Sequence, residues 1–465
     1  MRSIEVDLLT DLGAYPGVGI GMTLTARSLA TGCYDIPHAR FDIRGVATNT
    51  PPTGAFRGAG RPEAMHMLER AMDVLAAELG VDPVELRRRN LVPSDRFPYR
   101  NVMGESYDSA DFELALAEAL RIVDYEGLRA EQRRRAGSGS ALGVGVCCYV
   151  EVSAGNVGLE RDDASVEVTE DGQVVVVVGT SAHGQGHVTT YAQIVASTMG
   201  VNVGDVRVVQ SDTAAVPKGQ GTGGSRSIQI GGSAIRRACD QVIEQAAALA
   251  AHLLEVAVED VEVVDGGLGV RGVPGSTVSW AKLAATIGDE TARPAGSASR
   301  LFADEHFDQG GGTSPFGCHV AVVEVDTETG RVRLVRIVAV DDCGVVINPM
   351  LAEGQVHGGL AAGIGQALFE HSVFDDDGNP LTATFADYGM PSAADLPSYD
   401  TAHTVTPTEL NPLGAKGLGE AGTTGSIAAV HNAVLDALAP LGVRDLQIPL
   451  TPMQVWRAIR DAGGR

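Results

Sequence analysis

The sequence predicts an α+β fold, in which strands and helices share the chain without a regular alternation of strand, helix and strand. Two strand pairs are indicated, because Asp171-Gly172 and the turn at residues 327–330 each separate two Val-rich runs. Apolar residues recur at helical spacing in several other stretches. The predicted helices cover residues 189–199, 232–256, 352–370 and 424–439.

A run of glycine and serine predicts where the chain divides. Residues 136–140 read Ala-Gly-Ser-Gly-Ser, a composition typical of a flexible linker. The sequence therefore predicts a first segment over residues 1–135 and a second segment over residues 141–465. Within the first segment, Asp82 followed by Pro83 is typical of a helix N-cap and first helical position.

Composition and charge exclude several classes of function. The formal net charge of −24 opposes binding to the phosphate backbone of a nucleic acid or to an anionic membrane surface. No apolar run reaches the roughly 20 residues that cross a bilayer, and the N-terminus lacks the apolar core of a signal peptide. The six cysteines form no C-x-x-C pair, which argues against an iron–sulfur, zinc or disulfide framework. We therefore expect a reduced, cytoplasmic chain whose redox function needs a cofactor or a partner.

Glycine-rich loops that lead into predicted helices are the main functional signal. Glycine accounts for 58 of 465 residues, about an eighth, compared with a usual share of roughly 7%. Helix N-termini present unpaired N–H groups and partial positive charge, and glycine lets the backbone approach a ligand closely. One such loop is typical of an ordinary turn, but several together indicate a cradle for a large anionic ligand. The loops cover residues 54–60, 183–187, 219–227, 353–355 and 417–422.

Two of these loops match other motifs but lack their context. Residues 417–422 read G-x-G-x-x-G, but no strand precedes them and no acidic residue ends a second strand, which excludes a dinucleotide-binding fold. His183 and His187 have the spacing of a zinc-binding H-E-x-x-H motif. Gln185 and two glycines replace its general base and interrupt the helix that this geometry needs, so a zinc hydrolase is the weakest alternative.

Taken in chain order, the five loops resemble those of the molybdenum hydroxylase family, which includes xanthine dehydrogenases, aldehyde oxidases and carbon monoxide dehydrogenase. The resemblance covers essentially the whole chain and matches the C-terminal, molybdopterin-binding part of the large subunit. It implies a two-lobed molybdopterin-binding fold of the aldehyde oxidase and xanthine dehydrogenase type. Residues 1–135 would end the first lobe and residues 141–465 would form the second.

The resemblance also implies which residues meet the cofactor. Glu420 takes the place of the family's catalytic base, and Arg57 lies near the metal centre, where it can stabilise negative charge. Phe56 takes the place of a ring that covers the substrate. The backbone of Gly224 approaches the molybdenum, which the pterin itself holds. The implied cofactor-binding residues are Phe56, Arg57, Gly58, Gly184, Gln185, Gly186, Thr222, Gly223, Gly224, Ser225, Gln355 and Gly419.

The implied function is oxidation of an aldehyde or an N-heterocycle, with water as the source of oxygen. The implied cofactor is molybdenum–molybdopterin, in the cytosine dinucleotide form that is usual in bacterial relatives. Iron–sulfur and flavin modules are absent from the sequence, so the expected partners are an iron–sulfur small subunit and an FAD-binding medium subunit. The alternative is a non-catalytic remnant, or a split half that is inactive without a separate N-terminal chain.

Two departures from the family pattern limit the expected activity and the expected extent of the subunit. Carbon monoxide dehydrogenases have a copper-holding cysteine directly after the arginine of the first loop, where this chain has Gly58. Carbon monoxide oxidation is therefore not expected. Family large subunits also extend further at the N-terminus, and Met1 falls within what should be an internal strand. We expect a truncated or split large subunit, whose missing N-terminal half carries a further loop beside the molybdenum.

Overall fold

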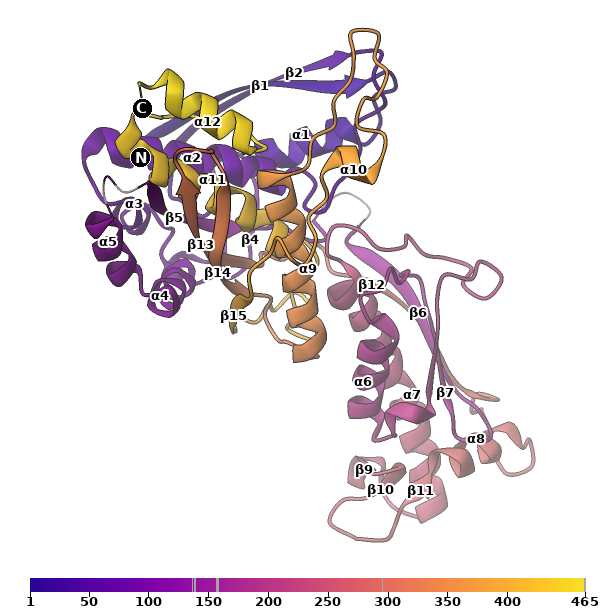
Figure 1. Cartoon of the computed structure of the whole chain (residues 1–465). Coiled ribbons are helices and arrows are strands. Elements are labelled where there is room, and N and C mark those ends of the chain that lie inside the picture. The colour runs from indigo at the N-terminus through magenta and orange to yellow at the C-terminus, as the bar shows by residue number, and fades with distance from the viewer. Residues whose placement is uncertain (136, 138, 156–158, 295, 464–465) are drawn as a thin grey trace.

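The computed structural model describes residues 1–135, 137, 139–155, 159–294 and 296–463, which form two lobes of unequal size (Figure 1). The larger lobe carries both ends of the chain, and the smaller lobe extends away from it as an elongated body. Helices and strands follow one another without a regular alternation, which confirms the predicted α+β class. No helix in the described part of the chain is both long enough and apolar enough to cross a membrane.

The larger lobe is built on a four-stranded sheet in the order β15–β14–β13–β5. Its strands are β5 (Ser140–Val150), β13 (Phe316–Asp326), β14 (Val332–Asp342) and β15 (Tyr399–Thr404). β13 and β14 are antiparallel and form the pair predicted around residues 327–330. The almost wholly buried helix α11 (Ala421–Leu438) packs on this sheet. An added Cβ at Gly145 of β5 would lie 2.2 Å from the Ala429 carbonyl oxygen, so glycine permits this close approach.

Further helices and short strands complete the larger lobe around this sheet. Asp82 accepts hydrogen bonds from the backbone of Val84 and Glu85, which confirms the predicted N-cap of α3. The further helices and short strands of the larger lobe are α1 (Gly19–Ser28), α2 (Arg61–Leu79), α3 (Pro83–Arg88), β3 (Tyr99–Arg100), β4 (Ser106–Tyr107), α4 (Phe112–Val123), α5 (Tyr125–Arg134), α9 (Pro349–Leu368), α10 (Phe385–Tyr388) and α12 (Pro452–Asp461).

Two strands of the larger lobe stand apart from its main sheet. β1 (Ser3–Gly13) and β2 (His38–Ala47) pair in parallel and project along the edge of the lobe (Figure 1). In the described part of the chain they form a sheet of only two strands. Exposed and half-buried residues alternate along β1. Such alternation is typical of a strand that is covered on one face.

The smaller lobe contains a second four-stranded sheet, in the order β12–β6–β7–β8, against which α6 and α7 pack. β6 and β7 are antiparallel neighbours and form the hairpin predicted at Asp171-Gly172. A π-helical turn at Ser227–Gly231 leads directly into α7. The elements of this lobe are β6 (Arg161–Val168), β7 (Val174–Val178), α6 (His187–Met199), β8 (Val206–Val209), α7 (Gly232–Leu254), β9 (Val261–Val264), β10 (Gly267–Val270), β11 (Val278–Ser279), α8 (Trp280–Gly288) and β12 (Leu301–Asp308).

The boundary between the two hydrophobic cores does not fall at residues 136–140. One core collects buried residues between positions 26 and 152 and between positions 316 and 459, and the other collects residues between positions 154 and 307. The chain thus passes between the lobes close to Ser153 and Thr313, which form a β-bridge. Ala136 and Ser138 of the predicted linker lie outside the described residues, and the family-type division at residues 136–140 stays a prediction.

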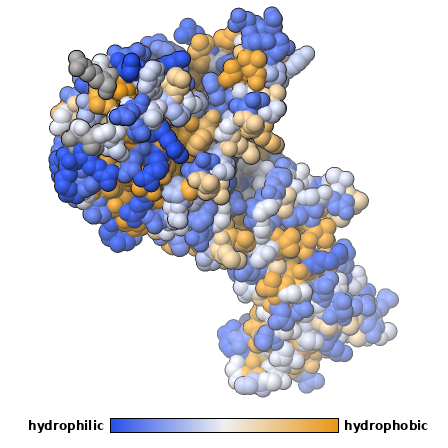
Figure 2. Space-filling view, in the orientation of Figure 1, coloured by the Kyte–Doolittle hydropathy of each residue, from blue (hydrophilic) through white to orange (hydrophobic). Residues whose placement is uncertain are grey.

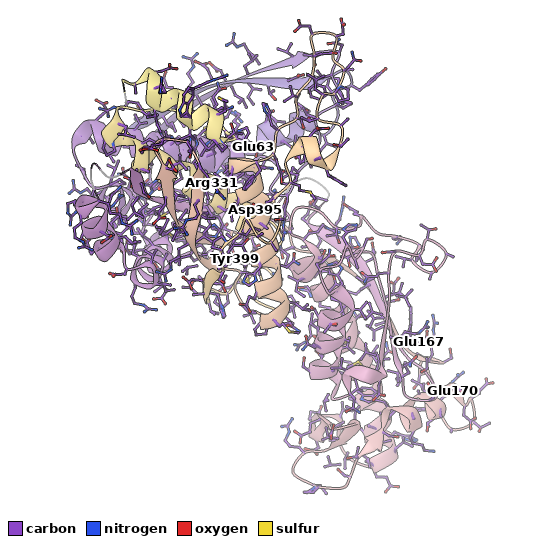
Figure 3. The ribbon with its side chains drawn as sticks, viewed as in Figure 1. Glu63, Glu167, Glu170, Arg331, Asp395 and Tyr399 are labelled. Carbon is purple, nitrogen blue, oxygen red and sulfur yellow. The ribbon has the colours of Figure 1, made fainter. Side chains whose placement is uncertain are left out.

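The face of the molecule that Figure 2 shows is mostly polar on both lobes. Hydrophilic residues cover most of the visible face, with smaller hydrophobic patches between them (Figure 2). Acidic side chains occur on the smaller lobe, at Glu167 and Glu170, and on the larger lobe, at Glu63 and Asp395 (Figure 3). The negative charge that the sequence carries is therefore not confined to one lobe.

Candidate cofactor and active site

A cavity of about 640 Å³ lies where the two lobes meet. All five glycine-rich loops contribute to its lining, although they are separated by up to several hundred positions in the sequence. The predicted site residues in the lining are Arg57, Gly184, Gln185, Thr222, Gly223, Gly224, Ser225, Gln355, Gly419 and Glu420. The structure therefore brings together most of the residues that the sequence predicts for one site.

Three predicted residues lie outside this lining. Gly58 and Gly186 are chain neighbours of lining residues, and Gly58 contacts Glu420 through its backbone. Phe56 does not line the cavity, and its side chain is 45% exposed. Within the described residues, Phe56 thus forms no wall of the cavity.

The carboxylate of Glu420 is held from two sides. The Gly58 backbone N–H donates to its Oε1 at 3.0 Å, and the Ser225 hydroxyl donates to its Oε2 at 2.9 Å. Although Glu420 is the N-cap residue of α11, its side chain makes no capping hydrogen bond to that helix. The side chain is 13% exposed. Glu420 is thus oriented by loops from both lobes and not by its own helix.

Arg57 joins the first loop to the last two. Its Nε donates to the Gly419 carbonyl at 2.5 Å, and its Nη2 donates to the Gln355 carbonyl at 2.9 Å and to the Gln355 Oε1 at 3.1 Å. Burial lowers the pKa of Arg57, an effect that the negative charge of Glu420 opposes. An arginine remains charged under such a shift, so Arg57 brings a positive charge to the cavity while it fixes the backbone next to Glu420.

The shape of the glycine loops fits a large, hydrogen-bonding ligand. An added Cβ at Gly184, Gly223 or Gly354 would meet no atom within 4 Å, and all three residues line the cavity. Side chains at these positions would extend into the open space beside the backbone, so glycine keeps that space free for a ligand. The arginine charge of Arg57 and the amides of Gln185 and Gln355 suit an anionic, polar cofactor. Among the described residues, no three His, Cys, Asp or Glu side chains form a group that could hold a metal ion.

Two charged residues beside Glu420 are absent from the sequence-based site. Arg61, in the first turn of α2, places Nη1 3.6 Å from the Glu420 Oε1 and Nε 3.9 Å from the Glu151 Oε1. Burial and the charge of Glu420 raise the pKa of Glu151 to about 7, whereas Arg61 lowers it. Arg61 lies four positions after Arg57 and directly follows the same loop, a signal that could have indicated it. Glu151 directly follows a long apolar run, which marks it as a charged residue at the end of a buried strand.

Buried hydrogen bonds tie the Glu420 loop to the loop of Ser225. The Ser153 hydroxyl accepts from the Gly417 backbone N–H at 3.2 Å and from the Gln229 Nε2 at 2.9 Å. The same Gln229 Nε2 donates to the Ser225 carbonyl at 2.9 Å. Ser153 and Gln229 are fully buried. Because buried polar networks are rigid when fully paired, these contacts fix the relative positions of Ser225 and Glu420.

The chain is similar to known proteins over nearly its whole length. Two family models, both described as molybdopterin cofactor-binding domain, match residues 1–91 and 118–397. The carbon monoxide dehydrogenase large chain of Hydrogenophaga pseudoflava is 37% identical over 98% of this chain and 59% of its own length. The nicotine 6-hydroxylase large subunit of Paenarthrobacter nicotinovorans is 36% identical over 99% of this chain and 58% of its own length.

A solved structure shares the fold. Quinoline 2-oxidoreductase from Pseudomonas putida 86 superposes with a TM-score of 0.92 at 35% identity, over 97% of this chain and 59% of that one. Fold and cavity thus define a molybdopterin-binding chain of the two-lobed type. The chain belongs to the molybdenum hydroxylase family of oxidoreductases, as the sequence predicts. It spans about three fifths of the length of the relatives named here.

Proposed function

We propose that this chain is the C-terminal, molybdopterin-binding part of a molybdenum hydroxylase large subunit, with Glu420 as the catalytic base. The observation that carries the proposal is the placement of Glu420. Its carboxylate lines a cavity to which all five glycine-rich loops contribute, and donors from both lobes orient it. A base must lie within hydrogen-bond reach of the proton that it removes, and this fixed placement at the cavity meets that requirement.

The residues around the cavity have complementary roles in this proposal. When bound, the molybdenum–pterin cofactor supplies the redox chemistry and the oxygen that derives from water. Glu420 accepts a proton at a carboxylate oxygen, and the Gly58 N–H and Ser225 hydroxyl keep that carboxylate facing the cavity. Arg57 stabilises negative charge that develops near it. Gly184, Gly223 and Gly224 let the backbone approach the cofactor, and Gln185 and Gln355 bind its polar edge.

The proposed substrate is an aldehyde or an N-heterocycle. Relatives named for nicotine and quinoline support the heterocycle. Carbon monoxide oxidation is not proposed, because Gly58 occupies the position of the copper-holding cysteine. The structure adds a steric reason: Gly58 has a φ of +109°, and an added Cβ would lie 2.3 Å from the Pro62 Cγ.

The proposal includes partner chains. Both curated relatives are named as a large chain or large subunit, which supports an iron–sulfur small subunit and an FAD-binding medium subunit here. A separate or fused N-terminal half would complete the site, and the two-stranded parallel sheet of β1 and β2 offers edges for it. We further propose the cytosine dinucleotide form of the cofactor and a cytoplasmic location.

Metal analysis and one substitution test the proposal. The chain is co-expressed with the products of its neighbouring genes, and the purified complex is assayed for molybdenum and for turnover of aldehydes and N-heterocycles. We expect about one molybdenum per chain. Glu420→Gln should keep that molybdenum and lower kcat by roughly a hundredfold to ten-thousandfold, the usual contribution of a general base. Glu170→Gln, an exposed change on the smaller lobe, is the control and should leave turnover unchanged.

The same experiment separates the proposal from its alternative. A folded chain without molybdenum in any complex would support a non-catalytic remnant. Molybdenum with full turnover in Glu420→Gln would leave the cofactor site in place but remove Glu420 as its base.

A further inference from the structure

Glu151 is a buried acid that the proposed reaction does not use. It directly follows β5, its side chain is 0% exposed, and its backbone N–H donates to the Pro315 carbonyl at 2.8 Å. Neither of its carboxyl oxygens has a hydrogen-bond partner among the described residues. An ionised carboxylate in such a place is strongly disfavoured unless a cation and several donors compensate for the lost water.

Arg61 is the cation that Glu151 shares with Glu420. One guanidinium places Nε 3.9 Å from the Glu151 Oε1 and Nη1 3.6 Å from the Glu420 Oε1. Its hydrogen bonds go elsewhere, because Nε and Nη2 donate to the Val152 carbonyl and Nη1 donates to the Gly58 carbonyl. Arg61 therefore offers both carboxyl groups its charge but neither of them a short hydrogen bond.

Other polar groups near Glu151 do not remove the competition between the two acids. Arg57 and the Ser225 hydroxyl also favour the ionised form of Glu151. Their effects on its pKa are smaller than those of Arg61 and Glu420. Tyr149, on the same strand, remains a neutral phenol, because burial, Asp341 and Glu151 together raise its pKa well above the ordinary value. Like charges that share one site cannot both ionise easily.

The hydrogen bonds decide which acid holds a proton. Glu420 receives two donors, the Gly58 N–H and the Ser225 hydroxyl, and these stabilise a carboxylate. Glu151 receives no donor within hydrogen-bond distance, because the nearby Ser225 hydroxyl donates to Glu420. A neutral carboxyl is therefore favoured at Glu151.

We propose that Glu151 retains a proton in the folded chain, and that the charge of Glu420, with which it shares Arg61, keeps that proton on Glu151. The catalytic meaning of this pair rests on the proposed function of Glu420. Glu151 is a positioning residue in this scheme, since it acts through Arg61 and through its charge and does not line the cavity. The burial of Glu151 and the repulsion from Glu420 raise its pKa to about 7, which agrees with a neutral Glu151 in weakly acidic solution.

Infrared difference spectroscopy of the purified complex tests the pair without turnover. The Glu151→Gln spectrum is subtracted from that of the wild type, which cancels other buried acids such as Glu69, whose pKa burial raises to about 8. The difference should show the C=O stretch of a protonated carboxyl that disappears with a midpoint near pH 7. In Glu420→Gln the repulsion is absent, so the same band should persist but titrate at a lower pH. Glu170→Gln serves as the matched control and should match the wild type in both respects.

Each outcome bears on the proposal. The absence of this band from the difference between wild type and Glu151→Gln, or a midpoint that does not move in Glu420→Gln, would overturn it. If Glu151→Gln does not fold, the measurement on Glu420→Gln still decides. Unchanged turnover in Glu420→Gln, together with the infrared shift, would reject Glu420 as the base while it leaves the pair in place.

Discussion

The backbone N–H of Gly58 donates a hydrogen bond to the Oε1 of Glu420 at 3.0 Å, across 362 positions of the sequence. This contact joins the first glycine-rich loop to the last one and points the carboxylate along the cavity wall. It depends on a backbone that residues with side chains rarely adopt, because the φ of Gly58 is +109°. Gly58, at the position where the family resemblance implies a cysteine in carbon monoxide dehydrogenases, thus orients Glu420 in this chain.

Gly58→Cys should therefore fail to create a copper site. The new Cβ would lie 2.3 Å from the Pro62 Cγ, and a left-handed backbone with a side chain costs about 1–3 kcal/mol. We expect a loss of stability of this order in urea unfolding, lower turnover because the Glu420 contact is displaced, and no copper in metal analysis. Gly54→Ala in the same loop is the control, since a Cβ there meets no atom within 4 Å. Stoichiometric copper in Gly58→Cys with unchanged stability would contradict this account.

Ser225→Ala removes the second donor to Glu420. The lost bond is 2.9 Å long and ends on a carboxylate that is 13% exposed and keeps its Gly58 contact. Hydrogen bonds to charged groups contribute about 1–2 kcal/mol in such a setting, so kcat should fall roughly 5- to 30-fold. KM should change little, because the side chain orients the base. Ser197→Ala, whose hydroxyl only bonds its own helix, is the control. An unchanged kcat would show that Gly58 alone fixes Glu420.

The sequence predicts the local parts of this site well. Glycine loops and helices depend on neighbouring residues, so short stretches predict the hairpin of β6 and β7 and the helix at 424–439, which α11 matches although it begins earlier, at Ala421. The convergence of the five loops could be expected only from their resemblance to a known family. The roles of the individual residues remain predictions.

The sequence alone could not show contacts between side chains that lie on segments far apart in the chain. Glu151 meets Arg61 because α2, which begins at Arg61, packs against β5, which ends just before Glu151, and these segments are far apart in the chain. The Gly/Ser composition of residues 136–140 is typical of a linker, but whether a segment joins a core depends on its partners. β5 begins at Ser140 and belongs to the same core as residues of the first segment.

Arg57→Lys should separate the contribution of the positive charge of Arg57 from that of its hydrogen-bond geometry. The guanidinium spans two loops, with Nε on the Gly419 carbonyl and Nη2 on Gln355. A lysine keeps the positive charge but cannot bond both partners in this planar arrangement. We expect kcat/KM to fall roughly tenfold to a hundredfold, a loss of about 1–3 kcal/mol of transition-state stabilisation. Molybdenum content, measured in parallel, should stay near that of the wild type, since the charge is retained. Wild-type kinetics in Arg57→Lys would show that only its charge matters.

A buried histidine pair should make the site sensitive to acid. The His66 Nε2 lies 2.5 Å from the His431 Nδ1, where α2 packs on α11. Burial lowers the pKa of His66 from 6.5 to about 4 and that of His431 to about 2. Because the folded values lie below the ordinary one, the pair contributes stability that is complete above about pH 6.5. That contribution decreases as the pH falls through 6.5 towards 4, since the unfolded chain binds protons that the folded chain excludes.

His66→Gln tests this link between acid stability and the site. The variant removes one titrating group and keeps a polar side chain opposite His431. The fall in Tm between pH 7 and pH 4.5 should be smaller in the variant than in the wild type, even if the variant is less stable at pH 7. His371→Gln, at an exposed position outside this pair, should leave the acid sensitivity unchanged. An identical fall in Tm for wild type and His66→Gln would show that acid acts elsewhere. Because α2 carries Arg61 and α11 follows Glu420, a loosened packing of these helices would also reduce turnover in acid.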